Sequence, residues 1–445
     1  MHIHPKKVKS KITVIGGGLA GVEAAYQVAK LGIAVDLYEM RPQVMTEAHS
    51  SDFLAEMVCS NSLGSGELTS ASGLLKRELK MLDSFFLLHA EKFKVPAGRS
   101  LSVDRLRLAA DITTELAAWP GITIQRREVK EIPAAESPVI IATGPLTSSD
   151  FAQTLARLTM RKNLFFFDAT CPLIRAESID LSKLFAASRY EKGDADFLNI
   201  PMDDEQYESF VQNLVQAEVV AAHDFEKNDF YDACLPLEEI ARRGKQSLAF
   251  GPLKPVGLID PRSGRRPHAV VQLRQDDLKK NFYQLVGFQT RLRYGDQKRI
   301  FRTLPGLENA EFERFGRMHR NTYINAPLII NNFSQHKKNS HIYFAGQLSG
   351  VEGYVESVSS GLLCGLFAAR ALLGRPLSAL PETTATGSLL AYIANANWKD
   401  FRPSKFTFGL IDDGALDLHD KKRKKQLKAE RALEELQVWI KKAAI

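Results

Sequence analysis

The spacing of apolar residues along this chain switches between two periods. Short apolar runs predict buried strands at residues 12–15, 35–38, 122–125, 139–141, 164–168, 269–273 and 341–348. Apolar residues that recur every three or four positions predict helices at residues 22–29, 72–89, 105–119, 203–220, 388–397 and 420–444. A further helix, rich in small residues, is expected to end near Leu373. Strands that alternate with helices favour an α/β fold.

The first strand–helix–strand unit, residues 11–40, has the most specific pattern. Its turn fits G-x-G-x-x-G and consists of Gly16, Gly17, Gly18, Leu19, Ala20 and Gly21. Gly16 permits a tight turn, Gly18 lets the backbone approach a pyrophosphate, and Gly21 lets the helix pack on the strand. Free N–H groups at the helix N-terminus attract phosphate. Glu39, 21 residues after Gly18, is placed to bind a ribose diol, and its acidity disfavours a 2′-phosphate.

Two later segments fit the same dinucleotide site. A buried strand runs into Ala142, Thr143 and Gly144, a junction that recurs where the chain of a two-dinucleotide-binding flavoprotein returns beneath its dinucleotide. A late strand leads to Gly346 and Gln347, and a glycine turn and a helix follow, as in many flavoproteins of this class. Each segment alone is a simple strand-to-turn junction. Together they predict an FAD site and argue against an S-adenosylmethionine site.

Composition excludes several classes of protein. The 445 residues carry 59 basic and 52 acidic side chains, a net charge of +7, which permits a polyanionic partner without requiring one. The four cysteines are far apart and form no ligand cluster, so we expect no metal site. No signal peptide or span of about 20 apolar residues is visible. We therefore expect a cytoplasmic protein that does not enter a membrane.

Two cysteines are candidates for chemistry. Cys59 lies in a long hydroxyl-rich loop, where a pocket thiol and a buried small hydrophobe are equally plausible. Cys234 precedes Leu235-Pro236 and the helix expected after them, where the helix dipole would favour a thiolate. An inert thiol is the alternative there. Cys171 and Cys364 are weaker candidates.

Cations gather in two places. Residues 251–302 are rich in arginine and lysine with interleaved aromatic residues, and residues 421–425 read Lys-Lys-Arg-Lys-Lys on an amphipathic helix. Arginine binds phosphate bidentately, so RNA backbone contact is one interpretation. A solvated charged face and core aromatics are the other.

Twelve motifs spread over almost the whole chain resemble those of the folate- and FAD-dependent tRNA (uracil-5-)-methyltransferase family, often called TrmFO. They are VIGGGLAGVEAA, VCSNSLG, GLLKREL, VPAGRSLSVDR, ATGPLTS, CLPLEEIARRG, GPLKPVGLIDPRSG, VVQLRQD, GFQTRL, PGLENAEF, MHRNTYI and AGQLSGVEGYVES. Gly64 departs from the family pattern, in which a basic residue is common, and Gly98-Arg99-Ser100 replaces a more glycine-rich turn.

The resemblance implies an activity and its reagents. The protein would form ribothymidine in the T-loop of tRNA, with FAD as cofactor, methylenetetrahydrofolate as methylene donor and NADH or NADPH as reductant. Cys234 would be the nucleophile that adds to C6 of the uracil, and Cys59 would assist or remove the C5 proton. His319, Arg320, Asn321 and Tyr354 would bind substrate. Gly353, Tyr354, Glu356 and Ser357 would complete the cofactor site.

The resulting expectation is a Rossmann-like two-dinucleotide-binding FAD domain with an inserted α+β domain. The FAD domain would comprise residues 1–150 and 316–445, and the insertion residues 151–315. The protein would be a monomer or a weak homo-oligomer. Three alternatives stay open. The first is a related enzyme, either one with the same chemistry on ribosomal RNA or a wobble-uridine modifier, against which the Cys59 and Cys234 motifs argue. The others are a small-molecule FAD oxidoreductase and a non-catalytic relative that binds flavin or RNA.

Overall fold

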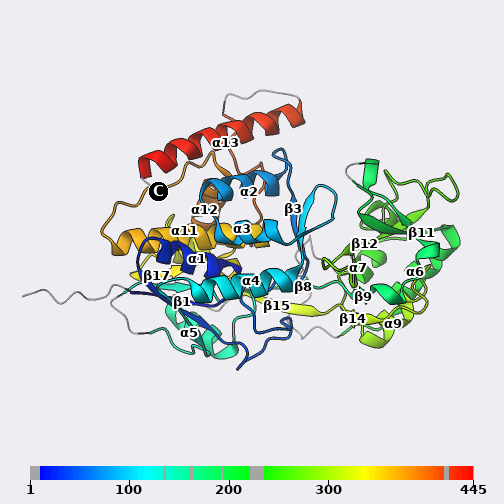
Figure 1. Ribbon diagram of the computed structural model, residues 1–445, viewed down its shortest axis with the longest axis horizontal. Coiled ribbons are helices and arrows are strands. Elements are labelled where there is room, and N and C mark those ends of the chain that lie inside the picture. Colours follow the sequence, from blue (N-terminus) through cyan, green and yellow to red (C-terminus); the bar gives the residue numbers. More distant parts are fainter. Residues whose placement is uncertain are drawn as a thin grey trace, which may run out of the picture.

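The computed structural model describes residues 11–133, 137–160, 164–191, 194–220, 235–414 and 420–443. These residues form two lobes, seen left and right in Figure 1. The first lobe contains a six-stranded sheet in the order β16-β17-β7-β1-β2-β6, in which β16 alone is antiparallel. Its strands are β1 (Lys11–Ile15), β2 (Ala34–Glu39), β6 (Ile122–Arg126), β7 (Val139–Ile141), β16 (Gln335–His336) and β17 (Asn339–Phe344).

Distant parts of the chain meet in this sheet. Val139 pairs with Thr13 on one side and with Ile342 on the other. The carboxyl ends of β1, β7 and β17 therefore lie side by side, where open α/β sheets bind their ligands. The α/β prediction for this lobe is confirmed.

Helices cover the sheet and each other. Those of the first lobe are α1 (Leu19–Lys30), α2 (Ala71–Met81), α3 (Phe85–Lys92), α4 (Arg105–Ala118), α5 (Ser149–Thr159), α10 (Ala326–Ile329), α11 (Tyr354–Leu372), α12 (Ala385–Asn395) and α13 (Lys421–Ala443). A small sheet in the order β3-β5-β4 lies beside them: β3 (Ser62–Ser65), β4 (Lys94–Val95) and β5 (Ser100–Val103).

Helices α1 and α11 pack backbone to backbone. A Cβ added at Gly361 would lie 2.2 Å from the carbonyl oxygen of Ala20, and one at Gly365 would lie 2.6 Å from that of Ala24. Only glycine allows this approach. Among the described helices, α11 alone is long and apolar enough to cross a bilayer, and 89% of that window is buried inside the protein.

The single helix expected at residues 72–89 is wrong, because two helices occupy the segment. Helix α2 ends at Met81, Asp83 adopts φ +61°, and Ser84 caps α3 by accepting the Leu87 N–H. One left-handed residue is enough to turn the chain, and the unbroken apolar spacing on either side conceals it.

Two buried glutamates bind the N-termini of other helices. Glu23 of α1 accepts the N–H groups of Phe85 and Phe86 at the start of α3. Glu78 of α2 accepts those of Ala385 and Thr386 at the start of α12. Each carboxylate satisfies N–H groups that the helix itself leaves without a partner.

The second lobe contains an antiparallel sheet in the order β10-β11-β12-β13-β9-β14. Its strands are β9 (Leu173–Arg175), β10 (Phe185–Ala186), β11 (Phe197–Met202), β12 (Ala269–Gln275), β13 (Phe282–Leu285) and β14 (Phe312–Arg314). Its helices are α6 (Asp204–Gln216), α7 (Leu237–Arg242), α8 (Ser247–Phe250) and α9 (Tyr294–Phe301). They enclose a hydrophobic core separate from that of the first lobe.

A two-stranded antiparallel ribbon, β8 (Leu164–Ala169) and β15 (Met318–Tyr323), joins the lobes. The domain division expected from the sequence stays a prediction. Helix α5 begins at its first boundary, yet Phe151 and Leu155 of α5 belong to the core of the first lobe. We therefore propose the β8–β15 ribbon as the natural border.

Candidate functional site

A cavity of about 1030 Å³ opens at the carboxyl ends of β1, β7 and β17. The residues predicted for the cofactor that line it are Gly16, Gly17, Gly18, Leu19, Ala20, Glu39, Ala142, Thr143, Gly144, Gly346, Gln347, Tyr354 and Ser357. We call it the first cavity. Gly21 does not line it: a Cβ there would lie 1.8 Å from the carbonyl oxygen of Gly16, so this glycine serves the contact between helix and strand.

The first cavity fits a dinucleotide. Gly16 adopts φ +107°, and a Cβ there would lie 2.4 Å from the carbonyl oxygen of Ala142. No atom lies within 4 Å of a Cβ built at Gly18, so the backbone there is open to a ligand. Gly18 is the N-cap of α1, whose first turn has neither a side-chain cap nor an acidic residue. The N–H groups of α1 are therefore available to phosphate.

Glu39 is held in place by a residue that sequence reasoning missed. Its carboxylate accepts the Gly17 N–H at 3.0 Å and the Arg41 Nε at 2.9 Å. Burial raises the pKa of Glu39, but the hydrogen bonds and charge of Arg41 and the Gly17 N–H outweigh it, and the pKa is lowered overall. The carboxylate is thus ionised and ready to accept ribose hydroxyls. Arg41, 1% exposed, also binds Glu56, and its only sequence signal is its place just after the strand that ends at Glu39.

A second cavity, of about 1190 Å³, adjoins the first. The two share the lining residues Val58, Pro145, Leu146, Gln347 and Tyr354. Of the residues predicted for the site, Cys59, His319, Asn321, Gly353 and Glu356 line the second cavity. Gly353 and Glu356, expected at the cofactor, thus lie beside the second cavity and outside the lining of the first.

The Cys59 backbone is bound from both lobes. Tyr354 at the start of α11 accepts the Cys59 N–H at 2.8 Å and the Ser60 N–H at 3.2 Å through its phenol oxygen. From the second lobe, Gln284 Nε2 donates to the Cys59 carbonyl at 2.8 Å, and Arg274 donates to Ser60 Oγ at 2.7 Å. The hydroxyl-rich loop that contains Cys59 is therefore held by hydrogen bonds from both lobes. Burial is the main reason why the pKa of Tyr354 is raised.

Cys234 lies outside the described residues. The helix expected after it is α7, which begins at Leu237 and is six residues long, with Glu238 and Glu239 in its first turn. So short and acidic an N-terminus offers less dipole stabilisation than the sequence suggested. The Leu237 N–H donates to the carbonyl of Gln289 at 2.7 Å, and Gln289 lines the second cavity. Helix α7 thus begins close to that cavity.

His319 and Asn321 lie on β15, and the side chain of Arg320 between them is not described. His319 is 6% exposed, and among the described residues its Nδ1 has no hydrogen-bond partner. Burial, and then the charges of Arg317 and Arg314, lower the pKa of His319 to about 4. A neutral imidazole therefore lines the second cavity, with its Nδ1 shielded from solvent and without a hydrogen-bond partner among the described residues.

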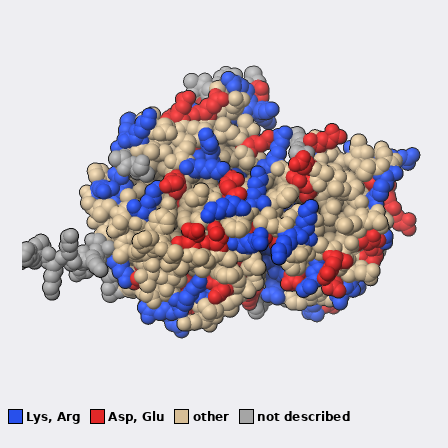
Figure 2. Space-filling view, viewed as in Figure 1, with Lys and Arg blue, Asp and Glu red and all other residues tan. Residues whose placement is uncertain are grey.

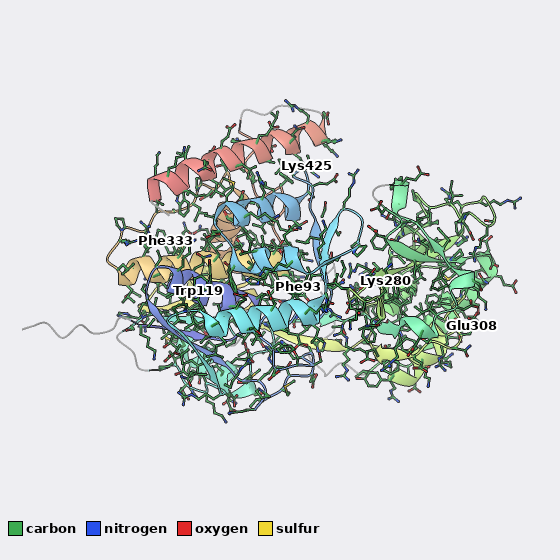
Figure 3. The ribbon with its side chains drawn as sticks, in the orientation of Figure 1. Phe93, Trp119, Lys280, Glu308, Phe333 and Lys425 are labelled. Carbon is green, nitrogen blue, oxygen red and sulfur yellow. The ribbon has the colours of Figure 1, made fainter. Side chains whose placement is uncertain are left out.

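The cation-rich segments are only partly available to RNA. Figure 2 shows basic and acidic side chains interspersed over the face in view. Within residues 251–302, four arginines form ion pairs: Arg262–Asp260, Arg291–Glu239, Arg293–Glu218 and Arg299–Asp296. At the start of α13, Lys421, Lys422, Arg423 and Lys425 are exposed; Figure 3 labels Lys425.

Comparison with known proteins gives a consistent answer. The family model described as glucose inhibited division protein A matches residues 11–376. A methylenetetrahydrofolate--tRNA-(uracil-5-)-methyltransferase TrmFO of Anoxybacillus flavithermus is 50% identical over 97% of this chain and 100% of its own length. That of Dictyoglomus thermophilum is 51% identical over 98% and 99%. Among solved structures, Aquifex aeolicus GidA has a TM-score of 0.68 at 16% identity, covers 98% of this chain and 78% of its own, and supports the fold alone.

Proposed function

Because the chain belongs to the TrmFO family of methylenetetrahydrofolate--tRNA-(uracil-5-)-methyltransferases, we propose that it methylates C5 of a uridine in tRNA with methylenetetrahydrofolate as one-carbon donor. The observation that carries the proposal is the position of Cys59 in the wall of a cavity that shares Tyr354 and Gln347 with the dinucleotide cavity. A thiol and a cofactor site therefore meet at one place. The T-loop uridine is the proposed target.

FAD is the proposed occupant of the first cavity, because its glycine turn, open helix N-terminus and ionised Glu39 fit a dinucleotide with a free ribose diol. When bound, FAD supplies the electrons that reduce the one-carbon unit to a methyl group. NADH or NADPH is the proposed source of those electrons. The proposal also includes a cytoplasmic location, where tRNA is modified, and a monomer or weak homo-oligomer.

The chain's own residues would activate the uracil. C5 is a poor nucleophile until a thiolate adds to C6, which leaves an enolate-like carbon at C5. Cys234 is the proposed thiolate. Once C5 has gained its carbon, its proton must leave before the S–C6 bond breaks, and Cys59 is the proposed acceptor. His319, Asn321 and Tyr354 would position the base or the folate in the second cavity.

Methyl transfer to an unmodified tRNA transcript tests the proposal. The protein, FAD, methylenetetrahydrofolate and either NADH or NADPH are incubated with the transcript, and nucleosides are separated and weighed by mass spectrometry. We expect 5-methyluridine only when folate is present, and none with Cys234→Ala. A protein that binds FAD but forms 5-methyluridine only in ribosomal RNA would overturn the choice of tRNA.

A further inference from the structure

Three arginines from both lobes surround the Cys59 loop. Arg105 begins α4, Arg274 lies on β12 and Arg314 ends β14. Arg105 and Arg274 bind Met57 and Ser60, which lie close to Cys59 along the chain. Arg314 lies in one cross-strand row with Gln284, because both pair with Leu173, and Gln284 binds the Cys59 carbonyl. The charges of all three arginines act on Cys59. We call these three side chains the guanidinium cluster. None of them was singled out for the reaction by the sequence.

Several N–H groups of the cluster have no hydrogen-bond acceptor among the described residues. Arg105 donates to the Met57 carbonyl at 3.1 Å and to Asp276 Oδ2 at 2.8 Å. Arg274 binds Ser60 and Gln284. Within the described part of the chain, the Nε atoms of all three arginines and Nη2 of Arg314 are shielded from solvent and lack a hydrogen-bond partner.

Positive charge is therefore in excess here. Of the described carboxylates, only Asp276 forms an ion pair with the cluster. Burial lowers the pKa of Arg274 and of Arg314, and the charge of Arg105 lowers that of Arg314 further. Like charges that are shielded from solvent repel one another and lose hydration, which is unfavourable unless enough negative charge lies among them. Such a cluster persists where an anion balances it.

We propose that the guanidinium cluster holds the side chain of Cys59 as a thiolate in the resting protein, its proton having passed to solvent. Arg314, which has no other described partner to bind, is the positioning residue that acts through Cys59. The sulfur of Cys59 lies 3.9 Å from the carbonyl oxygen of Ala169, a long contact in which only the protonated thiol could donate. Tyr354 stays a neutral phenol and Asp276 is already paired with Arg105, so neither supplies further negative charge to the cluster. The charge of Arg274 also acts on Cys171, but this thiol is only 5% exposed, and burial disfavours its thiolate.

The other titratable side chains that line the second cavity are His319, Glu352, Glu356 and Lys405. A thiolate at Cys59 is ready to take a proton from C5 of a uracil, which gives this cysteine its part in the reaction. That use rests on the proposed function. The thiolate itself does not, because it is a property of the protein without RNA or folate.

Alkylation measures the thiolate directly. Iodoacetamide forms an S–C bond and releases iodide, and its rate follows the thiolate fraction. The full-length protein with FAD is treated from pH 5 to pH 10, and Cys59 is quantified by mass spectrometry in the peptide between Lys30 and Lys76, which holds no other cysteine. We expect an inflection at least about one unit below the ~8.5 of an ordinary thiol.

Variants separate charge from structure. Arg314→Met should move the inflection up by about one unit, roughly a tenfold slower reaction at pH 7, and Arg314→Lys should restore much of the shift. Arg175→Met is the matched control, since Arg175 lies in the neighbouring strand, is exposed and pairs with Glu313. Melting temperature should stay the same or rise in Arg314→Met, because a like-charge contact is removed.

An inflection near 8.5 in the unsubstituted protein, or one that Arg314→Met leaves in place, would overturn the proposal. If Arg314→Met does not fold, Arg314→Gln gives the same comparison. A low inflection in a protein that does not methylate tRNA would keep the cluster and reject the proposed function. Full methyl transfer by a protein whose Cys59 inflection is near 8.5 would keep the proposed function and reject the thiolate proposal.

Discussion

The phenol oxygen of Tyr354 accepts the backbone N–H of Cys59 at 2.8 Å, across 295 residues of sequence. One residue begins the helix that faces the first cavity, and the other lines the second. The hydrogen bond therefore fixes the position of the thiol relative to the dinucleotide site.

Tyr354→Phe removes the acceptor of two N–H groups, those of Cys59 and Ser60. A buried donor left without a partner costs about 1–3 kcal/mol, which loosens the loop. We expect methyl transfer to fall by roughly tenfold while FAD stays bound, as judged by its visible absorbance. Tyr392→Phe, whose hydroxyl binds the carbonyl of Arg402, is the control. Equal loss in both variants would show a general effect on stability.

Glu39→Gln should weaken FAD binding. The change removes an ionised acceptor from the ribose position and one of the two carboxylates that pair with the buried Arg41, leaving Glu56 as the other. Dissociation constants from flavin fluorescence should rise by at least tenfold, about 1.4 kcal/mol. Glu47→Gln changes an exposed carboxylate in the following loop and should leave the constant as it is. An unaltered constant in Glu39→Gln would remove this residue from the cofactor site.

Glu78 should make stability depend on pH. Burial is the main reason why its pKa is raised to about 7, above the 4.5 of an ordinary glutamate side chain. A raised carboxyl pKa means that the folded protein binds the proton more tightly than the unfolded chain. The stabilisation is complete below pH 4.5 and is lost as pH rises through about 7.

The free energy of unfolding of the unsubstituted protein, relative to that of Glu78→Gln, should therefore fall between pH 5 and pH 8. Urea unfolding at four pH values measures it. Glu91→Gln, at an exposed carboxylate paired with Lys80, is the control. The free energy of unfolding relative to this variant should not fall between pH 5 and pH 8. A relative stability that rises with pH would contradict the assignment.

Gly361→Ala should separate α1 from α11. The new Cβ would lie 2.2 Å from the carbonyl oxygen of Ala20, backbone that cannot move aside alone. Overpacking of this kind costs about 1–3 kcal/mol, and FAD affinity should fall as well because Ala20 lies in the glycine turn. Thermal melts and flavin titration measure both. Gly295→Ala in α9 has nothing within 4 Å of its Cβ and should be neutral or stabilising.

Features that depend on neighbouring residues were predictable from the sequence. The order of strand, glycine turn, helix and second strand ending at Glu39 was predicted correctly, because local spacing determines it. The break at Asp83 was missed because a single left-handed residue leaves apolar spacing intact. Arg41, Gln284 and Arg274 were missed for another reason. Arg41 binds Glu39, two residues away, and an arginine after a strand has no distinctive pattern. Gln284 binds Cys59 and Arg274 binds Ser60, and only the fold brings β12 and β13 to that loop.

The ribbon of β8 and β15 has a thermodynamic consequence. It joins two lobes that also contact each other at the Cys59 loop and at Gly98, whose N–H binds Asp196. The second cavity is lined by Tyr354 from one lobe and Gln289 from the other. A ligand that touches both walls gains affinity when the lobes are together, and by reciprocity its binding draws them together. The same equilibrium therefore sets two properties. One is the affinity for a small molecule in this cavity, and the other is the spacing of the two lobe surfaces that a folded RNA could span.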